Sequence, residues 1–219
     1  MIKLPNIKDS FEFENNFYLT CNSDRISKLL IQYELFLKTK NIPGEIVECG
    51  VFKGTSLIRF ASYRNFYKKQ TKKIIGFDTF GKFPSAGFSK DINVRKKFVQ
   101  QSGNQSIAKK QLEKILKHKK IGMNVELVKG DIRKTIIEYL EEYPKLKISL
   151  LNLDVDLYEP SKVILENFYP RMTKGGIIIL DDYGVFPGET KAVNEFIKKT
   201  KIKIQKFDFR KTPSYIIKK

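Results

Sequence analysis

The sequence is poor in the residues that bind soft metals. Its 219 residues include one histidine and two cysteines, and Cys21 and Cys49 form no metal-type spacing. A structural zinc site needs several such ligands, so this class of site is disfavoured. Cys49 lies in a predicted strand, and both thiols are interpreted as structural. We expect His118, at the lysine-rich end of a predicted helix, to be solvated or to sit at a helix terminus rather than to act in catalysis.

Long apolar runs are also missing. No run approaches the roughly 20 residues of a membrane-spanning helix. The first residues, MIKLPNIKDSFEFENN, lack the apolar core of a signal peptide. We therefore expect a soluble, cytoplasmic protein with no membrane span. Its length suits one domain, residues 1–219, with an N-terminal arm and helix over 1–42 and an α/β core over 43–219.

Acidic residues are in the minority. The chain has 42 lysines and arginines against 24 aspartates and glutamates, a net charge of +18. Such a charge favours polyanionic partners. The lysines are nevertheless spread along the chain, where helices would present a solvated face, and no aromatic RNA-binding signature accompanies them. The charge therefore favours solubility and attraction of anionic small molecules over nucleic acid as a partner.

Apolar runs of strand length alternate with helical patterns, which predicts an α/β fold with a mostly parallel sheet. A helix with Ser23 or Asp24 as its N-cap should precede the first strand. The irregular segment 79–106, with some helix near 94–99, reads as a lid or a substrate-selecting loop. Expected strands cover residues 45–49, 74–77, 125–128, 148–153 and 177–180, followed by an antiparallel pair near 202–207 and 214–217.

Two neighbouring strands end in acidic residues. Asp154 and Asp156 follow the first, and Asp181 and Asp182 follow the second. Because the carboxyl ends of parallel strands share one edge of the sheet, where ligands bind in open α/β folds, we expect these side chains to face each other there. Four carboxylates would repel one another without a cation, which argues against the alternative that they only cap loops and helices.

A glycine-containing loop follows the first strand. Its pattern is Glu48-x-Gly50-x-x-x-Gly54-x-Ser56, which differs from the GxGxxG of dinucleotide-binding folds. Glycine allows a sharp turn and a close approach of ligand, although an ordinary strand-loop-helix turn has the same appearance.

Two further aspartates follow the next predicted strands. Asp78 ends the second strand, where a carboxylate accepts hydrogen bonds from a ribose diol, and this supports a ligand that contains adenosine. Asp131 follows the strand predicted at residues 125–128, where it either reaches the base of that ligand or caps the next helix. Both readings of Asp131 remain open.

These segments together resemble the macrocin O-methyltransferase family of sugar methyltransferases. The resemblance rests on VECGVFKGTS, GFDTFGKFP, KGDI, LNLDVDLYEP and GGIIILDDYGVFPG, in that order over about residues 43–200. It implies a Rossmann-like class I methyltransferase fold with a seven-stranded sheet whose last strand is antiparallel. It also implies S-adenosylmethionine, a divalent metal, usually magnesium, and a sugar hydroxyl as acceptor.

The resemblance also implies roles for particular residues. Asp78 would hold the ribose hydroxyls, and Asp131 with Ile132 would lie by the adenine. The metal ligands would be Asp154, Asp181 and Asp182, of which Asp154 is also the first candidate to accept the proton of the acceptor hydroxyl. The methionine and ribose side of the cofactor would be lined by Glu48, Gly50, Gly54, Thr55 and Ser56.

The sequence departs from the family pattern at Val155, where glycine is common, and in segment 79–106, so the acceptor is left open. We expect a magnesium-dependent O-methyltransferase acting on a sugar that is free, nucleotide-linked or part of a glycoside. The alternatives are a nucleic-acid or catechol-type methyltransferase, or a non-catalytic protein that binds S-adenosylmethionine. Aromatic residues in the N-terminal arm also suggest a homo-oligomer.

Overall fold

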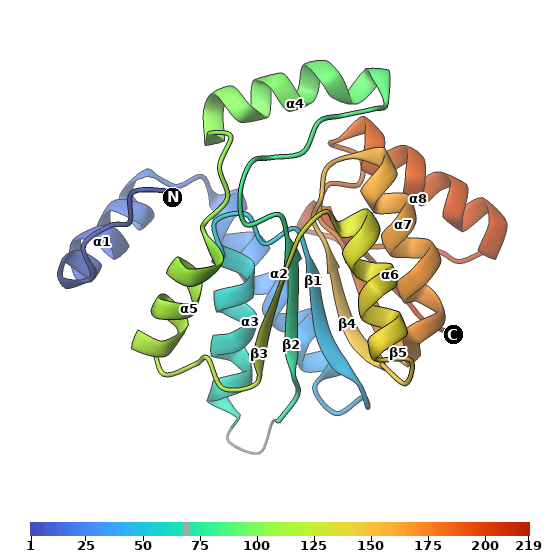
Figure 1. The fold of residues 1–219 in the computed structure, drawn as a ribbon, viewed down its shortest axis with the longest axis horizontal. Coiled ribbons are helices and arrows are strands. Elements are labelled where there is room, and N and C mark those ends of the chain that lie inside the picture. The colour runs from blue at the N-terminus through green and yellow to red at the C-terminus, as the bar shows by residue number, and fades with distance from the viewer. Residues whose placement is uncertain (68–70) are drawn as a thin grey trace.

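A computed structural model of the chain describes residues 1–67 and 71–219. Of the lysine-rich turn expected at 68–73, residues 68–70 therefore lie outside the described residues. Seven strands form one sheet in the order β3-β2-β1-β4-β5-β7-β6, with helices against both faces (Figure 1). The strands are β1 (Glu45–Cys49), β2 (Ile74–Asp78), β3 (Val125–Lys129), β4 (Ile148–Leu153), β5 (Met172–Leu180), β6 (Gln205–Phe207) and β7 (Arg210–Ile217).

The sheet has the predicted mixed character. β1 to β5 run parallel, and β7 is antiparallel to both β5 and β6. Every residue of β4 is buried, as expected for a strand covered on both faces. β4 pairs with both β1 and β5, so the carboxyl ends of these strands are adjacent. The α/β fold with an antiparallel last strand is confirmed.

Two hydrophobic clusters fill the space between the sheet and its helices, one on each face of the sheet. The first packs under α2, α3 and α5, and the second under α6, α7 and α8. The helices are α1 (Ser10–Thr20), α2 (Ser23–Thr39), α3 (Thr55–Phe66), α4 (Ser89–Ser102), α5 (Lys109–His118), α6 (Ile132–Glu142), α7 (Tyr158–Phe168) and α8 (Pro187–Thr200), with short 3-10 turns at Ile7–Asp9 and Tyr169–Arg171. His118 is the exposed last residue of α5.

Helix α2 shows how tertiary packing selects a face. Its N-cap is Asn22, whose side chain accepts a hydrogen bond from Asp24 N, so the prediction of Ser23 or Asp24 as the cap is wrong. Leu30 belongs to the apolar pattern but is 52% exposed, whereas the polar Gln32 is fully buried. The buried face of α2 therefore carries polar groups toward the end of the sheet where the acidic residues lie.

Helix α4 is longer than the stretch expected near 94–99. Its one buried residue is the charged Asp91, so it has no apolar stripe from which a helix could be predicted. It lies across the top of the molecule, over the carboxyl ends of the strands (Figure 1).

Helix α1 buries no residue and stands apart at the left of Figure 1. Phe11 and Leu19 on this helix are 76% and 83% exposed. None of the helices in the described part of the chain has the length and apolar character needed to cross a membrane.

Candidate functional site

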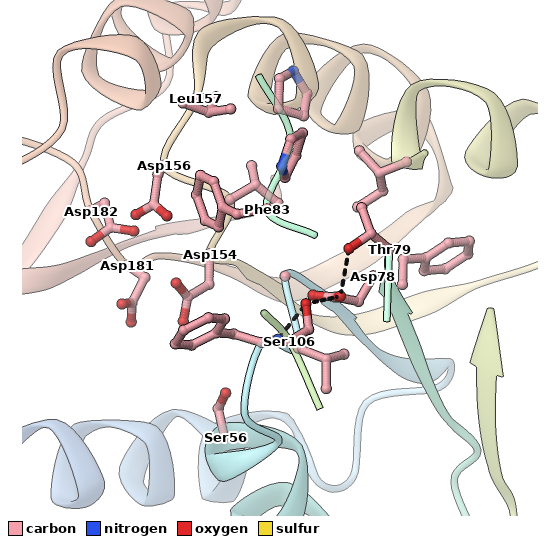
Figure 2. A pocket seen from close by; sticks show the side chains of 18 of the residues that line it. Ser56, Asp78, Thr79, Phe83, Ser106, Asp154, Asp156, Leu157, Asp181 and Asp182 are labelled. Carbon is pink, nitrogen blue, oxygen red and sulfur yellow. Dashed lines mark hydrogen bonds between the residues drawn. The ribbon is translucent and has the colours of Figure 1, made fainter. Parts of the chain in front are cut away.

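A cavity of about 420 Å³ lies at the carboxyl ends of the parallel strands (Figure 2). Its volume falls in the range of small-molecule sites. Of the eleven residues to which the family resemblance assigns a cofactor or metal role, nine line it: Gly50, Thr55, Ser56, Asp78, Asp131, Ile132, Asp154, Asp181 and Asp182. Glu48 and Gly54 are not among its lining residues.

The loop after β1 is shaped by its glycines. Gly50 has a φ of +95°, and a Cβ there would lie 1.6 Å from the carbonyl oxygen of Asp154. Glycine at this position therefore allows the end of β1 to lie against the end of β4. Gly54 has a φ of +83° and is the N-cap of α3, where a Cβ would press on Leu112. These glycines serve backbone geometry, and any role in contacting a cofactor stays a prediction.

Glu48 lies beneath the cavity, fully buried. Its carboxyl accepts hydrogen bonds from the hydroxyl of Ser56 and, at 3.3 Å, from the amide of Asn152. Burial raises the pKa of Glu48 to about 8, because the charged form is poorly solvated there. Its second oxygen has no partner among the described residues. Glu48 therefore orients Ser56, which does line the cavity.

Asp78 ties together three segments at the end of β2. One carboxylate oxygen accepts a hydrogen bond from Phe52 N at 2.9 Å. The other accepts from Phe80 N at 2.6 Å and from the Ser106 hydroxyl at 2.7 Å (Figure 2). Asp78 thus holds the β1 loop and the start of segment 79–106 in place.

Asp131 is the N-cap of α6, which was one of the two roles expected for it. Its side chain accepts from Arg133 N at 3.0 Å and also pairs with the Arg133 guanidinium. Hydrogen bonds from this arginine lower the pKa of Asp131. Because Asp131 lines the cavity as well, a contact with a ligand base stays a prediction.

The acidic residues after β4 and β5 converge, as their positions predicted. Asp154, Asp156 and Asp182 each place a carboxylate oxygen within 4.8 Å of the others. Burial raises the pKa of Asp156 to about 8, and burial with repulsion between neighbours raises the pKa values of Asp154 and Asp182 further above their usual range. One oxygen of Asp182 has no hydrogen-bond partner in the described chain. The charged forms of these carboxyls are therefore disfavoured in the protein alone, and a bound cation would stabilise them.

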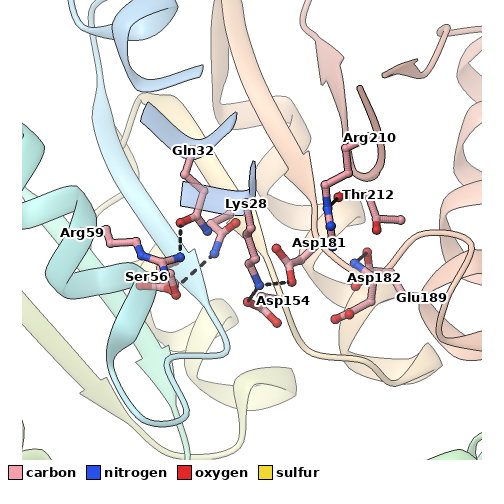
Figure 3. A network of polar contacts seen from close by, with 12 residues as sticks. Lys28, Gln32, Ser56, Arg59, Asp154, Asp181, Asp182, Glu189, Arg210 and Thr212 are labelled. Carbon is pink, nitrogen blue, oxygen red and sulfur yellow. Dashed lines mark hydrogen bonds and ion pairs between the residues drawn. The ribbon is translucent and has the colours of Figure 1, made fainter. Parts of the chain in front are cut away.

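Lys28 of α2 reaches this acidic cluster from 126 residues earlier in the chain (Figure 3). Its ammonium lies 2.5 Å from Asp181 Oδ2 and 3.6 Å from Asp154 Oδ2. Burial alone would lower the pKa of Lys28, but the two carboxylates outweigh it and raise the pKa. Lys28 was not expected at this site from the sequence, although the spacing of Lys28 from Ile31, Gln32 and Leu35 places it on the buried face of α2.

Aromatic side chains also line the cavity. Phe98 of α4 packs against Phe52, Phe83 and Phe186, with ring centroids 5.5, 5.4 and 6.0 Å away. All four rings line the cavity. Segment 79–106 thus lies where a lid or substrate loop was expected, and its role in selecting a substrate stays a prediction.

The cavity has two halves. We call the part lined by the loops after β1, β2 and β3 the cofactor half, because the cofactor is expected there; its lining residues are 50–53, 55–56, 78–79 and 130–133. The acceptor half comprises the acidic residues after β4 and β5, together with Lys28 and the aromatic residues of segment 79–106.

Among known proteins, three curated antibiotic O-methyltransferases are similar in sequence. A tetracenomycin rhamnosyl 4'-O-methyltransferase from Streptomyces olivaceus is 26% identical over 66% of this chain and 54% of its own length. Demethyldecarbamoylnovobiocin O-methyltransferase from Streptomyces niveus is 26% identical over 71% and 59%. Mycinamicin III 3''-O-methyltransferase from Micromonospora griseorubida is 24% identical over 71% and 61%. The chain thus spans little more than half the length of these relatives.

Solved structures are similar over more of their length. The calicheamicin methyltransferase CalS11 is 28% identical, with a TM-score of 0.78 over 95% of this chain and 85% of that chain. The O-methyltransferase NovP, at 22% identity and a TM-score of 0.73 over 89% of this chain and 79% of that chain, shares the fold. The model of the macrocin O-methyltransferase family matches residues 21–215, and the chain belongs to this family.

Proposed function

We propose that this chain transfers the methyl group of S-adenosylmethionine to a hydroxyl of a sugar, with a magnesium ion held by its acidic cluster. The observation that carries the proposal is that the cofactor half and the acidic cluster open into one cavity. A bound cofactor and a cation-held hydroxyl would therefore meet there. Membership of the macrocin O-methyltransferase family supports the same reaction.

The cofactor half suits the parts of S-adenosylmethionine in order. Asp78 stands where its carboxylate can accept hydrogen bonds from the ribose hydroxyls. Asp131 and Ile132 flank the place for the adenine, one polar and one apolar. Thr55 and Ser56 begin α3, where backbone N–H groups and the helix dipole favour the carboxylate of the methionine part.

The donor chemistry of the acidic cluster fits magnesium. Carboxylate oxygens are ligands of hard divalent cations, and three of them already lie within 4.8 Å of one another. Asp154 and Asp182 belong both to this trio and to the set implied by the family. The third ligand is Asp181 in the family set and Asp156 in the geometric trio, because Asp181 is paired with Lys28 here. When bound, magnesium would orient the acceptor hydroxyl and lower its pKa.

The protein's own contribution to the rate is mainly positioning. Methyl transfer from a sulfonium is an in-line displacement, so the acceptor oxygen must lie behind the methyl carbon. The acidic cluster and the aromatic side chains confine the acceptor to one side of the cavity. Asp154 is the proposed acceptor of the hydroxyl proton, since it lies between the two halves of the cavity.

The acceptor is proposed to be a sugar that is free, nucleotide-linked or part of a glycoside. CalS11 is described as a TDP-rhamnose 3'-O-methyltransferase, and the S. olivaceus relative acts on a rhamnosyl group. Arg25 and Lys53 also line the cavity, so an anionic group on the acceptor would find positive charge there.

The test is transfer of labelled methyl from S-adenosylmethionine to nucleotide sugars, glycosylated small molecules, catechols and bulk RNA, each with magnesium and with EDTA. We expect label on a sugar-bearing acceptor, in the presence of magnesium, and its loss in Asp154→Ala. The exposed Asp208→Ala serves as the matched control. Label on RNA that is insensitive to EDTA would contradict both the acceptor class and the metal site.

A further inference from the structure

Asp91 of α4 is a buried carboxylate outside the cavity, and it has no role in the proposed reaction. It is the one buried residue of α4 and has no exposed surface. A buried charge of this kind is costly unless other groups hold it, so its partners indicate what it does.

The partners of Asp91 are the first turns of two other helices. Its Oδ2 accepts a hydrogen bond from Tyr158 N, the first residue of α7, at 3.0 Å. The carboxylate also accepts from the backbone N–H of Gly188, in the first turn of α8. Both N–H groups lie at the positive ends of helix dipoles and lower the pKa of Asp91, whereas burial has the larger effect and raises it; Oδ1 has no hydrogen-bond partner among the described residues.

Gly188 shows how tightly this junction is built. A Cβ at Gly188 would lie 2.1 Å from Asp91 Oδ2 and 2.4 Å from Tyr158 N. No larger residue fits while α4, α7 and α8 keep this arrangement. Beside the junction, the ammonium of Lys191 lies over the rings of Phe88 and Tyr158, at 4.6 and 4.0 Å from their centroids.

The first turns of α7 and α8 also lie next to the acidic cluster, because Asp156 precedes α7 and Asp182 precedes α8. Asp156 lies two residues before Tyr158, and its carbonyl oxygen accepts from Glu189 N at 3.2 Å. The buried carboxyl of Glu189 in turn accepts from Asp182 N at 3.0 Å. Asp91 therefore joins α4 to the backbone that positions Asp156 and Asp182.

Helix α4 also contributes to the aromatic lining of the cavity. Two turns along α4 from Asp91, Phe98 lines the acceptor half. Between them, Arg95 donates to the carbonyl oxygens of Phe83 and Pro84 at 3.1 and 2.5 Å, which holds Phe83 against α4. The placement of these rings therefore depends on where α4 is held.

We propose that Asp91 is a positioning residue that fixes α4 over the acceptor half of the cavity by binding the first turns of α7 and α8. Its effect on catalysis rests on the proposed function, because it acts through acceptor binding. Phe52 of the cofactor half contacts Phe98 of α4, but Asp78 and Asp131, which are expected to bind the cofactor, form their hydrogen bonds with segments other than α4. Loss of Asp91 should thus weaken acceptor binding and leave cofactor binding unchanged.

The test compares Asp91→Ala and Asp91→Asn with Lys97→Ala, an exposed position on the same helix. Three quantities are measured: hydrogen exchange of residues 89–102, the dissociation constant of S-adenosylhomocysteine, and KM and kcat for the best acceptor. In Asp91→Ala we expect faster exchange confined to α4 and adjoining segments, and a KM raised about tenfold. kcat should change less than KM, and the dissociation constant should not change.

Asp91→Asn keeps one oxygen that can accept a hydrogen bond, so its exchange rate and KM should lie between those of Asp91→Ala and the wild type. Lys97→Ala should match the wild type in both quantities. Unchanged exchange over 89–102 in Asp91→Ala would overturn the proposal, and so would equal losses of cofactor and acceptor binding. If the wild type methylates no acceptor, the proposed function fails, whereas the exchange data still decide whether Asp91 anchors α4.

Discussion

The two halves of the cavity treat their carboxylates differently. In the cofactor half, Asp78 and Asp131 already accept hydrogen bonds from backbone N–H groups, and the pKa of Asp131 is lowered by Arg133. In the acceptor half, the carboxylates of Asp154, Asp156 and Asp182 crowd one another, and their pKa values are raised. The cofactor half is thus preorganised, whereas the charged carboxylates of the acceptor half need a cation to stabilise them.

The largest expected effect follows from removing charge in the acceptor half. Asp154→Asn keeps the shape of the side chain but removes a proposed metal ligand and proton acceptor. We expect the rate of methyl transfer to fall by about 10³-fold, with little change in binding of S-adenosylhomocysteine. A radiolabel assay and calorimetry measure the two quantities. Equal rates in Asp154→Asn and the exposed-site control Asp208→Asn would mean that Asp154 takes no part in the reaction.

The corresponding change in the cofactor half is Asp78→Ala. It removes the carboxylate that is predicted to accept hydrogen bonds from the ribose hydroxyls, and it leaves Phe52 N and Phe80 N without this partner. We expect the dissociation constant of S-adenosylhomocysteine to rise by about 10- to 100-fold, and magnesium binding to be retained. Calorimetric titrations with each ligand alone measure this. Loss of magnesium binding together with cofactor binding would show that the two halves are not separable.

Lys28 tests whether the acceptor half needs a cation for stability. Lys28→Met keeps the length of the side chain and leaves Asp181 without its partner. We expect the free energy of unfolding to fall by about 1–3 kcal/mol in EDTA, and magnesium to restore part of it by binding the folded state. Urea unfolding with and without magnesium measures this change. Lys38→Met is the control, because Lys38 forms an exposed pair with Glu34. A loss that magnesium does not alter would argue against a cation at this cluster.

Glu48, beneath the cofactor half, should make the stability of the fold depend on pH. Its pKa in the folded protein is about 8, against an ordinary value of 4.5. Its contribution to stability is complete below pH 4.5 and is lost as the pH rises toward 8, because the folded state retains a proton that the unfolded state has released. Glu48→Gln should therefore flatten the fall in stability over this range, by at most about 1.4 kcal/mol per pH unit. Parallel slopes of unfolding free energy against pH for variant and wild type would contradict the assignment.

Several features could be predicted because they depend on neighbours along the chain. The strand from Glu45 to Cys49 has the predicted bounds, since its apolar run and the following glycine are local signals. The order of strands placed Asp154 and Asp181 at neighbouring strand ends, because a parallel crossover sets that adjacency. The family motifs likewise pointed to the macrocin O-methyltransferase family, which the family model confirms over residues 21–215.

Other features depend on contacts between distant segments. Lys28 meets Asp181 across 153 residues; its spacing places it on the buried face of α2 but does not indicate which carboxylate it contacts. Asp91 is buried only because α4 meets the first turns of α7 and α8. Asp156 rather than Asp181 belongs to the trio of close carboxylates, while Asp181 pairs with Lys28 from α2.

The sequence by itself determined the alternation of strands and helices, the turn at Gly50 and the types of charge at the strand ends, since each follows from local conformation and hydrophobic period. Only the tertiary structure decided which charges meet, which face of α2 is buried and where α4 lies. The physical reason is that pairing of charges and burial of polar groups are properties of three-dimensional neighbours, which the order of residues does not reveal until the core has packed.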